Sequence, residues 1–472
     1  MTQNPRPSKF VPSRVLDTVY RRLGSQALSE RLQAVRALAV VRGARYVDDA
    51  GRVRMIDIAA TPWILTSAQL YYFHGVMRHL VGALQRLPTL YARVPSVRQI
   101  LHFDTQRESW LNLAAAPAAA PLAVIGRLDS TATYDHARWP TSFRMLEPNA
   151  VGVGGVHYAP TACSIIMDVF GDLLTRAFGG HALTPTPDPR RLLVDELTAV
   201  ARRLGRPLRG IALIENQEFT TGTDEFQELA RYLSDHGLQA VVADPRELRH
   251  TRGHLRARQI PVDLLYRDSE LDEFIQMESS GRRLTALRTA IREGRLVSGL
   301  SWEFDQKSAW EIFTDAQYAR YFPLSAQQLF RDHLLWTRLV RAARVSDPSG
   351  RLVDLPDFIR RHRARLVLKP NTLFGGAGVV LGLLASQRVW EQTLDRALRG
   401  RLRYVVQSLA QIPTQTLPFP VGSHGIRWQR RCVVSGFFFN SSAIGLVGRF
   451  SGQPVVNVSQ GGGLVSALWL HP

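Results

Sequence analysis

The sequence predicts a mixed α/β fold built from several units. Apolar residues recur at helical spacing over residues 14–95, strand, helix and strand alternate over 206–270, and glycine-punctuated strands fill Arg430–Trp469. At 472 residues the chain has room for about two to four domains. A content of 45% hydrophobic and 21% charged residues is ordinary for globular proteins and argues against a disordered or fibrous chain.

The first unit, residues 1–95, is predicted to be a helical N-terminal segment. One apolar stripe runs from Val15 to Leu23 and a second from Leu70 to Leu84, and Arg52–Ala60 alternates like a short strand between them. Amphipathic stripes of this kind bury a core face, so we interpret the segment as packing rather than chemical.

The second unit, residues 96–200, carries the first candidate site residues. A buried-type strand, Leu122–Gly126, leads into Arg127-Leu128-Asp129, and Phe143–Leu146 leads into Glu147-Pro148-Asn149. Alternate residues of a strand share a face, so each pair is expected to point the same way. Two carboxylates and an amide oxygen are ligands that Mg²⁺ prefers. Each residue taken alone could equally form a surface ion pair.

The third unit, residues 201–295, has the pattern of a doubly wound sheet. Strands are predicted at Ile211–Ile214, Gln239–Ala243 and Val262–Tyr266, with an amphipathic helix over Asp224–His236. Short glycine-punctuated connections between them predict parallel strands joined by a right-handed crossover.

The fourth unit, residues 296–472, begins with a helix-rich stretch, Ser325–Arg344. Strands are then predicted at Arg365–Lys369, Gly378–Gly382 and Tyr404–Gln407, and antiparallel strands follow over Arg430–Trp469.

Lysine is rare in this chain, which makes its positions informative. Only three of the 59 basic residues are lysines, and two of them, Lys307 and Lys369, stand well inside the chain. A lysine ammonium can point at a single phosphate oxygen, which the planar fork of arginine cannot imitate. Lys369 ends a predicted strand directly before the glycine-rich run 370–378, whose backbone amides could close on phosphates. The run lacks the Gly-Lys-Ser/Thr of a P-loop, and an ordinary tight turn is the alternative.

Taken together, these motifs resemble an ATP-grasp ligase. The resemblance rests on Arg-x-Asp at 127–129, Glu-x-Asn at 147–149, the lysine and glycine loop at 369–378, and the strand ending in Gln407. The lysine and loop follow the carboxylates here, an order that resembles the circularly permuted ATP-grasp enzymes, among them glutathionylspermidine synthase. Three further segments resemble the family more weakly: Asp263–Arg267, Asp305-Gln306-Lys307 and Leu335–Arg338.

The resemblance implies a permuted ATP-grasp fold around a doubly wound domain, and a role for each site residue. Asp129, Glu147 and Asn149 would hold Mg²⁺, and Arg127 would stabilise the transferred phosphoryl group. The expected nucleotide contacts are Lys307, Lys369, Gly375, Gly376, Gly378 and Gln407. Arg430 or Arg431, together with Arg449 and Asn457, are further candidates for contacts to phosphate or to an acidic substrate.

The implied activity is an ATP- and Mg²⁺-dependent carboxylate–amine ligase that works through an acylphosphate. Its partners would be small-molecule or peptide carboxylates and amines, and a homodimer is possible on this reading. The alternative is a catalytically silent relative that binds an acidic peptide or protein.

The net charge of +19 is weak evidence for a nucleic-acid partner, because it reflects a general preference for arginine over lysine. We interpret the basic run Arg360–Arg365 as a solvated helix end rather than a nucleic-acid footprint. Two cysteines cannot build a disulfide framework, and no apolar run is long enough to span a membrane, so a cytoplasmic protein is expected.

Overall fold

The computed structural model describes residues 12–47, 51–115, 126–134, 139–218, 225–373, 375–400, 402–422, 425–440, 443–456, 458 and 461–471. The predicted strand residues 122–125 and the candidate Asn457 therefore lie outside the described residues.

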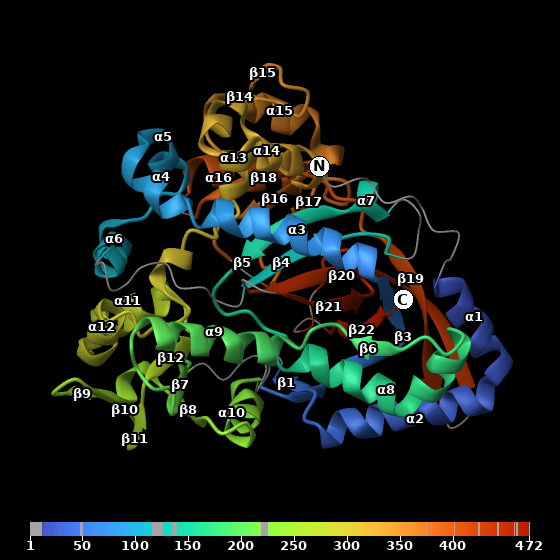
Figure 1. The fold of residues 1–472 in the computed structure, drawn as a ribbon. Coiled ribbons are helices and arrows are strands. Elements are labelled where there is room, and N and C mark those ends of the chain that lie inside the picture. Colours follow the sequence, from blue (N-terminus) through green and yellow to red (C-terminus); the bar gives the residue numbers. More distant parts are fainter. Residues whose placement is uncertain are drawn as a thin grey trace.

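A large sheet of eight strands forms the centre of the molecule (Figure 1). Its main path is β3-β22-β21-β20-β4-β5, with β19 paired to β20 and β6 paired to β22. Described neighbours pair antiparallel except β22 and β3, which run parallel. The strands are β3 (Asp57–Thr66), β4 (Gly126–Thr131), β5 (Arg144–Asn149), β6 (Leu183–Pro185), β19 (Thr414–Val421), β20 (Gly425–Phe439), β21 (Ile444–Ser451) and β22 (Gly463–Leu470).

Helices cover both faces of this sheet. In Figure 1, α3 (Ser67–Leu84) crosses above it, while α2 (Ser25–Val41) and α8 (Tyr158–Ala177) lie below, with α1 (Pro12–Leu23) beside them. Helix α3 begins with a capping box in which Thr66 and Gln69 bond each other's backbone N–H groups. Its Phe73 ring centroid lies 4.8 Å from those of both Phe143, directly before β5, and Phe437 of β20, so aromatic contacts fix α3 on the sheet.

The predicted doubly wound unit contains three parallel strands in the order β12-β7-β8, which confirms the parallel sheet. All five residues of β7 are buried. The strands are β7 (Gly210–Ile214), β8 (Gln239–Ala243) and β12 (Leu264–Arg267). The helices in this part of the chain are α9 (Pro189–Arg203), α10 (Glu225–Asp235), α11 (Leu271–Ser279) and α12 (Thr285–Arg292). A separate antiparallel sheet is formed by β9 (Leu248–Thr251), β10 (His254–Ala257) and β11 (Ile260–Val262).

A four-stranded antiparallel sheet, β13-β18-β16-β17, forms a third unit with a hydrophobic core of its own. Trp336, Leu368 and Trp390 belong to that core. The elements are β13 (Thr337–Leu339), β16 (Leu366–Pro370), β17 (Val380–Leu381), β18 (Tyr404–Ser408), α15 (Leu355–Arg361), α16 (Gln387–Arg399) and the hairpin β14 (Arg344–Ser346) and β15 (Leu352–Asp354).

Two sequence-based expectations need correction. The helix-rich stretch 325–344 is helical only as far as His333, the end of α14 (Leu324–His333), and Thr337–Leu339 forms β13 because it pairs with β18. The single strand expected over Arg52–Ala60 is two strands, β2 (Val53–Met55) and β3. Strand β3 is buried at nearly every position, so it shows no polar alternation that could mark its length.

The other described elements are β1 (Arg45–Val47), α4 (Leu87–Arg93), α5 (Pro95–Ile100), α6 (Thr105–Leu111), α7 (Trp139–Ser142) and α13 (Ala309–Thr314). Arg360 and Arg361 lie in the last turn of α15, where both contact Asp357. No helix among the described residues combines the length and the apolar character needed to cross a membrane. The domain boundaries at 95, 200 and 295 stay predictions.

Candidate active site

A cavity of about 1960 Å³ gathers most of the predicted site residues. It is lined by residues of the large sheet, of the four-stranded sheet and of the loops that follow β7 and β12. The predicted residues on its wall are Arg127, Asp129, Glu147, Asn149, Lys307, Lys369, Gly375, Gly376, Gln407 and Arg449. Of the other candidates, Gly378 is not part of the lining and Asn457 lies outside the described residues.

Strands β4 and β5 bring the two predicted motifs face to face. They pair antiparallel, with Arg127 opposite Asn149 and Asp129 opposite Glu147. The two-residue spacing within each motif thus places all four side chains in one small block of the sheet, as the sequence predicts.

Asp129 sits between two guanidinium groups. Arg127 Nε donates to its Oδ1 at 2.8 Å, and Arg449 Nη2, from β21, lies 2.9 Å from the same oxygen. Burial alone would raise the pKa of Asp129, yet the two guanidiniums outweigh burial and hold the pKa below its ordinary value. A Cβ at Gly436 of β20 would lie 2.7 Å from Arg127 Cδ, so this close packing needs glycine there.

Arg449 has spare hydrogen-bonding capacity. Its Nε is buried and finds no hydrogen-bond partner among the described residues. Burial lowers the pKa of the Arg449 guanidinium, and Asp129 only partly opposes this. Arg449 lines the cavity, so its guanidinium adds positive charge to the wall that an anion would meet.

The two interior lysines enter the same cavity from different elements. Lys307 Nζ lies 3.5 Å from Glu147 Oε2 and donates to the Leu373 carbonyl at 2.6 Å. Lys369 Nζ, on β16, donates to Gln407 Oε1 of β18 at 2.8 Å. Burial lowers the pKa of Lys369, and Glu147 opposes the shift. Both ammonium groups therefore stand beside the carboxylates of the large sheet.

Gln407 is oriented by three partners. Besides accepting from Lys369, its Nε2 donates to the Leu146 carbonyl at 3.1 Å and to Thr337 Oγ1 at 2.9 Å. The bond to Leu146 joins the four-stranded sheet to β5, and the two bonds together orient the carbonyl oxygen of Gln407 toward Lys369.

Asn371 is a site residue that sequence reasoning missed. Its side chain is buried, accepts from Ser308 N at 2.8 Å and donates to Gln306 Oε1 at 2.9 Å, while its carbonyl accepts from Lys307 N. The segment that carries Lys307 is thereby fastened to the start of the glycine loop. A buried asparagine gives no periodic signal, so only the folded contacts reveal this role.

Glycine is required in the loop after β16. Gly375, Gly376 and Gly378 have φ values of 68°, 78° and 69°, in the left-handed region. A Cβ on Gly376 would lie 2.6 Å from Val455 Cγ1, so the loop also packs too closely for a side chain there.

Another group of the lining residues is acidic, which the sequence did not predict. Asp268, Glu270 and Glu273 follow β12, and Glu303 and Asp305 come from the segment before Lys307. Burial, with the neighbouring carboxylates, raises the pKa of Glu273 and of Asp305 to about 7. The cavity thus has one cationic and one acidic wall.

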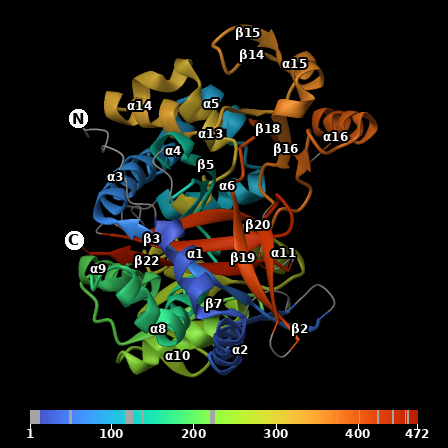
Figure 2. The same ribbon diagram turned by 90° about the vertical axis from the view of Figure 1, so that its right-hand side faces the viewer.

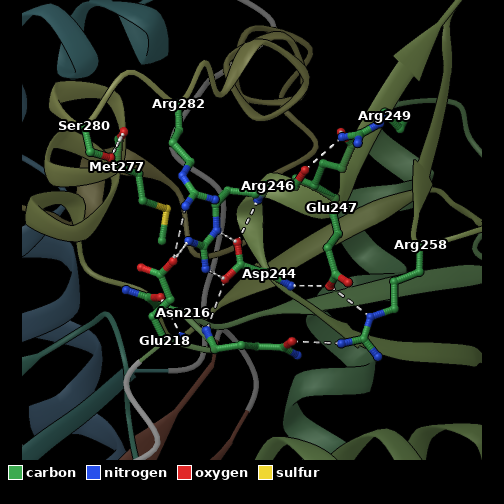
Figure 3. Close-up of polar contacts among 12 residues, drawn as sticks. Asn216, Glu218, Asp244, Arg246, Glu247, Arg249, Arg258, Met277, Ser280 and Arg282 are labelled. Atoms are coloured by element: carbon green, nitrogen blue, oxygen red, sulfur yellow. Dashed lines mark hydrogen bonds and ion pairs between the residues drawn. The ribbon is translucent and has the colours of Figure 1, made fainter.

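An ion-pair network lies around the segments that follow β7 and β8 (Figure 3). Arg246 binds Asp244 through Nε at 2.5 Å and Nη2 at 2.6 Å, and also contacts Glu218. Arg258 Nε donates to Glu247 at 2.9 Å. Asp244 further accepts from Gln217 N at 3.1 Å, which fixes the loop after β7 where it borders the cavity.

The cavity lining offers a few oxygen ligands and several N–H groups rather than a complete protein metal site. Within the described ranges, no group of three or more His, Cys, Asp or Glu side chains is arranged to hold a metal. Asp129, Glu147 and the amide of Asn149 form a smaller oxygen set, which suits Mg²⁺ that takes its other ligands from phosphates and water. The unpartnered Arg449 Nε and the glycine loop suit the phosphates themselves.

Comparison with known proteins gives a likeness of fold. No protein-family model matches the sequence, and no curated protein matches it. A glutathione synthetase-like effector of Globodera pallida, solved in its apo form, has a TM-score of 0.62 over 95% of this chain and 98% of its own, at 10% identity. A Methylobacillus flagellatus KT protein provisionally named gamma-glutamylcysteine synthetase covers 83% of this chain and 88% of its own, at 12% identity and a TM-score of 0.39. The chain therefore has the mixed α/β fold of the Globodera pallida effector.

Proposed function

We propose that the protein is an ATP-dependent ligase that joins a carboxylate to an amine. The observation that carries the proposal is the convergence of Lys307, Lys369 and the Asp129–Glu147 pair on one cavity. These groups come from segments that are far apart in the sequence, and burying charges together is costly without a ligand that uses them.

The nucleotide phosphates would lie between the cationic side chains and the glycine loop. Lys307, Lys369, Arg127 and Arg449 offer four cations against the two carboxylates of Asp129 and Glu147, so the wall favours an anion. Gly375 and Gly376 would bring backbone amides close to the phosphates. Asp129, Glu147 and Asn149 would hold Mg²⁺, which neutralises phosphate charge when bound.

The chemistry follows from charge and position. A substrate carboxylate oxygen attacks the γ-phosphorus, the bond to the β-phosphate bridging oxygen breaks, and ADP leaves as an acylphosphate forms. An amine nitrogen then attacks the acyl carbon, phosphate leaves with the C–O bond electrons, and the nitrogen loses a proton to give an amide. Arg127 and Arg449 would face the oxygens that gain charge, so the protein contributes mainly orientation and charge neutralisation.

The acidic wall supports an amine as the second substrate. Asp268, Glu270 and Glu273 line the cavity, and no ion pair joins these three to a cation among the described residues. Such a wall attracts an ammonium group and disfavours a second acid. The cavity volume exceeds the 300–1,000 Å³ or so of a typical small-molecule site, which leaves room for a nucleotide and two substrates.

One observation favours a second candidate, a catalytically silent relative that binds an acidic peptide or protein. Asp129 is already paired with both Arg127 and Arg449, a closed arrangement that needs no metal. In that case the cationic wall would bind the acidic partner directly.

Binding and turnover separate the two candidates. A rise in melting temperature with Mg-ATP, together with ADP release and a new amide mass in a screen of acids and amines, is the expected result. A chain that binds acidic peptides but is not stabilised by Mg-ATP and releases no ADP with any pair would refute the ligase.

A further inference from the structure

Glu225 is a buried carboxylate that reaches out of its own unit. It is the first residue of α10, is 6% exposed, and lines the cavity. Its Oε2 accepts from Gly155 N at 2.7 Å, and its Oε1 accepts from His157 N at 2.5 Å. Both donors belong to the turn that follows β5, so the side chain ties the doubly wound unit to the large sheet.

The turn to which Glu225 is hydrogen-bonded also binds Arg127. The carbonyl of Gly154 accepts from Arg127 Nη1 at 2.5 Å, next to the amide of Gly155 that Glu225 binds. Gly155 has a φ of 101°, and Gly152 one of 59°, so the path of the turn depends on glycine. Contacts run without a break from Glu225 through the turn to Arg127, and from Arg127 to Asp129.

We propose that Glu225 is a positioning residue for Arg127, acting through the backbone of Gly154 and Gly155. The inference rests on the proposed function, because it concerns the guanidinium that would face the phosphoryl group. Glu225 does not need to touch the nucleotide. It fixes the Gly154 carbonyl that orients the guanidinium of Arg127. If that carbonyl moved away, Asp129 alone would orient the guanidinium.

The ionised form of Glu225 suits this role, since a carboxylate accepts several N–H groups at once, whereas a protonated carboxyl has less acceptor capacity. Burial is the main cause that raises the pKa of Glu225 to about 7, and the backbone N–H groups oppose it. The facing titratable or charged groups are Asp268 and Tyr266 at the end of β12, Arg127 on β4, and His157 in the turn. Glu225 is therefore charged above about pH 7 and protonated below it.

The test compares nucleotide binding at pH 6 and pH 8 in full-length wild type, Glu225→Gln and Glu225→Asp. Calorimetric titration with a non-hydrolysable ATP analogue and Mg²⁺ should give about 10-fold tighter binding to wild type than to Glu225→Gln at pH 8, and a smaller ratio at pH 6. Glu225→Gln keeps the size of the side chain but not its charge, so the ratio isolates Glu225 from Glu273 and Asp305, which titrate in both proteins. Glu225→Asp should regain part of the affinity at pH 8.

A matched control is Glu228→Gln. Glu228 is also a buried carboxylate of α10, but it pairs with Arg231 and is not part of the cavity lining. This variant should keep the wild-type affinity at both pH values. Hydrogen exchange of peptides covering residues 150–160 should be faster in Glu225→Gln than in wild type at pH 8, with the rest of the chain unchanged.

The outcomes are distinguishable. Wild type that binds no nucleotide at either pH would overturn the proposed function. Wild type that binds nucleotide while Glu225→Gln retains its affinity and pH dependence would overturn the role of Glu225 alone. An equal loss of affinity in Glu228→Gln at pH 8 would also overturn it.

Discussion

Asp129 and Glu147 are directly paired across the antiparallel strands β4 and β5, yet their surroundings differ. Asp129 is bound by Arg127 and Arg449, whereas Glu147 has one ammonium, Lys307 Nζ, at 3.5 Å. The carboxylate of Asp129 is therefore fixed and neutralised by its two guanidinium partners, whereas that of Glu147 is less constrained and more available to a ligand.

Both carboxylates should be needed for nucleotide turnover. Asp129→Asn and Glu147→Gln are each expected to reduce ADP release at least about 100-fold, because each removes a negative oxygen from the proposed Mg²⁺ set. Asp129→Asn should also lower the free energy of unfolding, since it leaves two buried guanidiniums without their anion. Coupled-enzyme assays and urea unfolding measure the two effects.

The matched control for these variants is Asp172→Asn. Asp172 pairs with Arg31 and Arg176 on the surface, so neither turnover nor unfolding should change by more than a small amount. Full ADP release in Asp129→Asn would contradict the metal assignment.

The glycine loop should tolerate no side chain at Gly376. Gly376→Ala would add a Cβ 2.6 Å from Val455 Cγ1 at a left-handed φ, and we expect ATP affinity to fall about 10-fold because the loop must move. Gly422→Ala is the control: its φ is 61°, but a Cβ there meets nothing within 4 Å. The control should lose stability alone, and Val455→Ala should restore part of the affinity of Gly376→Ala in calorimetry.

Lys369 should destabilise the free protein in a pH-dependent manner. Burial lowers the pKa of Lys369 in the folded state. Between this pKa and the ordinary lysine pKa, the unfolded chain binds more protons than the folded one, so the free energy of unfolding rises with pH. The destabilisation caused by the buried ammonium is therefore complete at pH values below the folded-state pKa and is lost as the pH rises. Lys369→Met should therefore gain stability relative to wild type, by about 1 kcal/mol at neutral pH, and the gain should shrink toward pH 10. Urea unfolding across this range measures the difference.

Lys369→Arg separates the charge from its shape. Arginine stays ionised from pH 7 to pH 10, so the destabilisation by a buried charge at this position should not decrease with pH in Lys369→Arg. The planar guanidinium should still impair ATP binding. A constant stability difference between Lys369→Met and wild type from pH 7 to pH 10 would contradict the lowered pKa.

Asn371 should matter for both stability and nucleotide binding. Asn371→Ala leaves Ser308 N and Gln306 Oε1 without their partner, which should cost about 1–3 kcal/mol of unfolding free energy. Lys307 should lose its fixed position, so ATP affinity should fall as well. Gln387→Ala, which removes an exposed amide bonded to Glu391, is the control and should change neither quantity. An Asn371→Ala variant with wild-type ATP affinity would refute the link to Lys307.

The sequence could predict what short spacing encodes. The i, i+2 pairs Arg127/Asp129 and Glu147/Asn149 were expected on shared faces, and β4 and β5 do place them in register. The parallel unit was predicted because glycine punctuation and apolar runs mark its strands. Lysine rarity singled out Lys307 and Lys369, and both line the cavity.

Roles created by distant contacts could not be predicted. Asn371 reaches residues more than 60 positions away, and Glu225 bonds amides 68 and 70 positions away. Neither residue belongs to a periodic pattern, and a carboxylate buried against backbone N–H groups looks like a surface residue in the sequence. Strand β13 was missed for the same reason, since it is a strand only through its pairing with β18.

The order in which the chain emerges from the ribosome has a consequence for this sheet. Strand β3, residues 57–66, pairs in parallel with β22, residues 463–470 (Figure 2, blue and red). Strands β4 and β5 lie between β3 and β22 in the sequence. Arg449 reaches Asp129 only after some 320 further residues have been made. The central sheet is thus assembled late and from non-local partners, which slows folding and leaves the edge of β3 open during synthesis. A nascent chain should need a chaperone, or the early cover of α1 and α2, until β22 arrives.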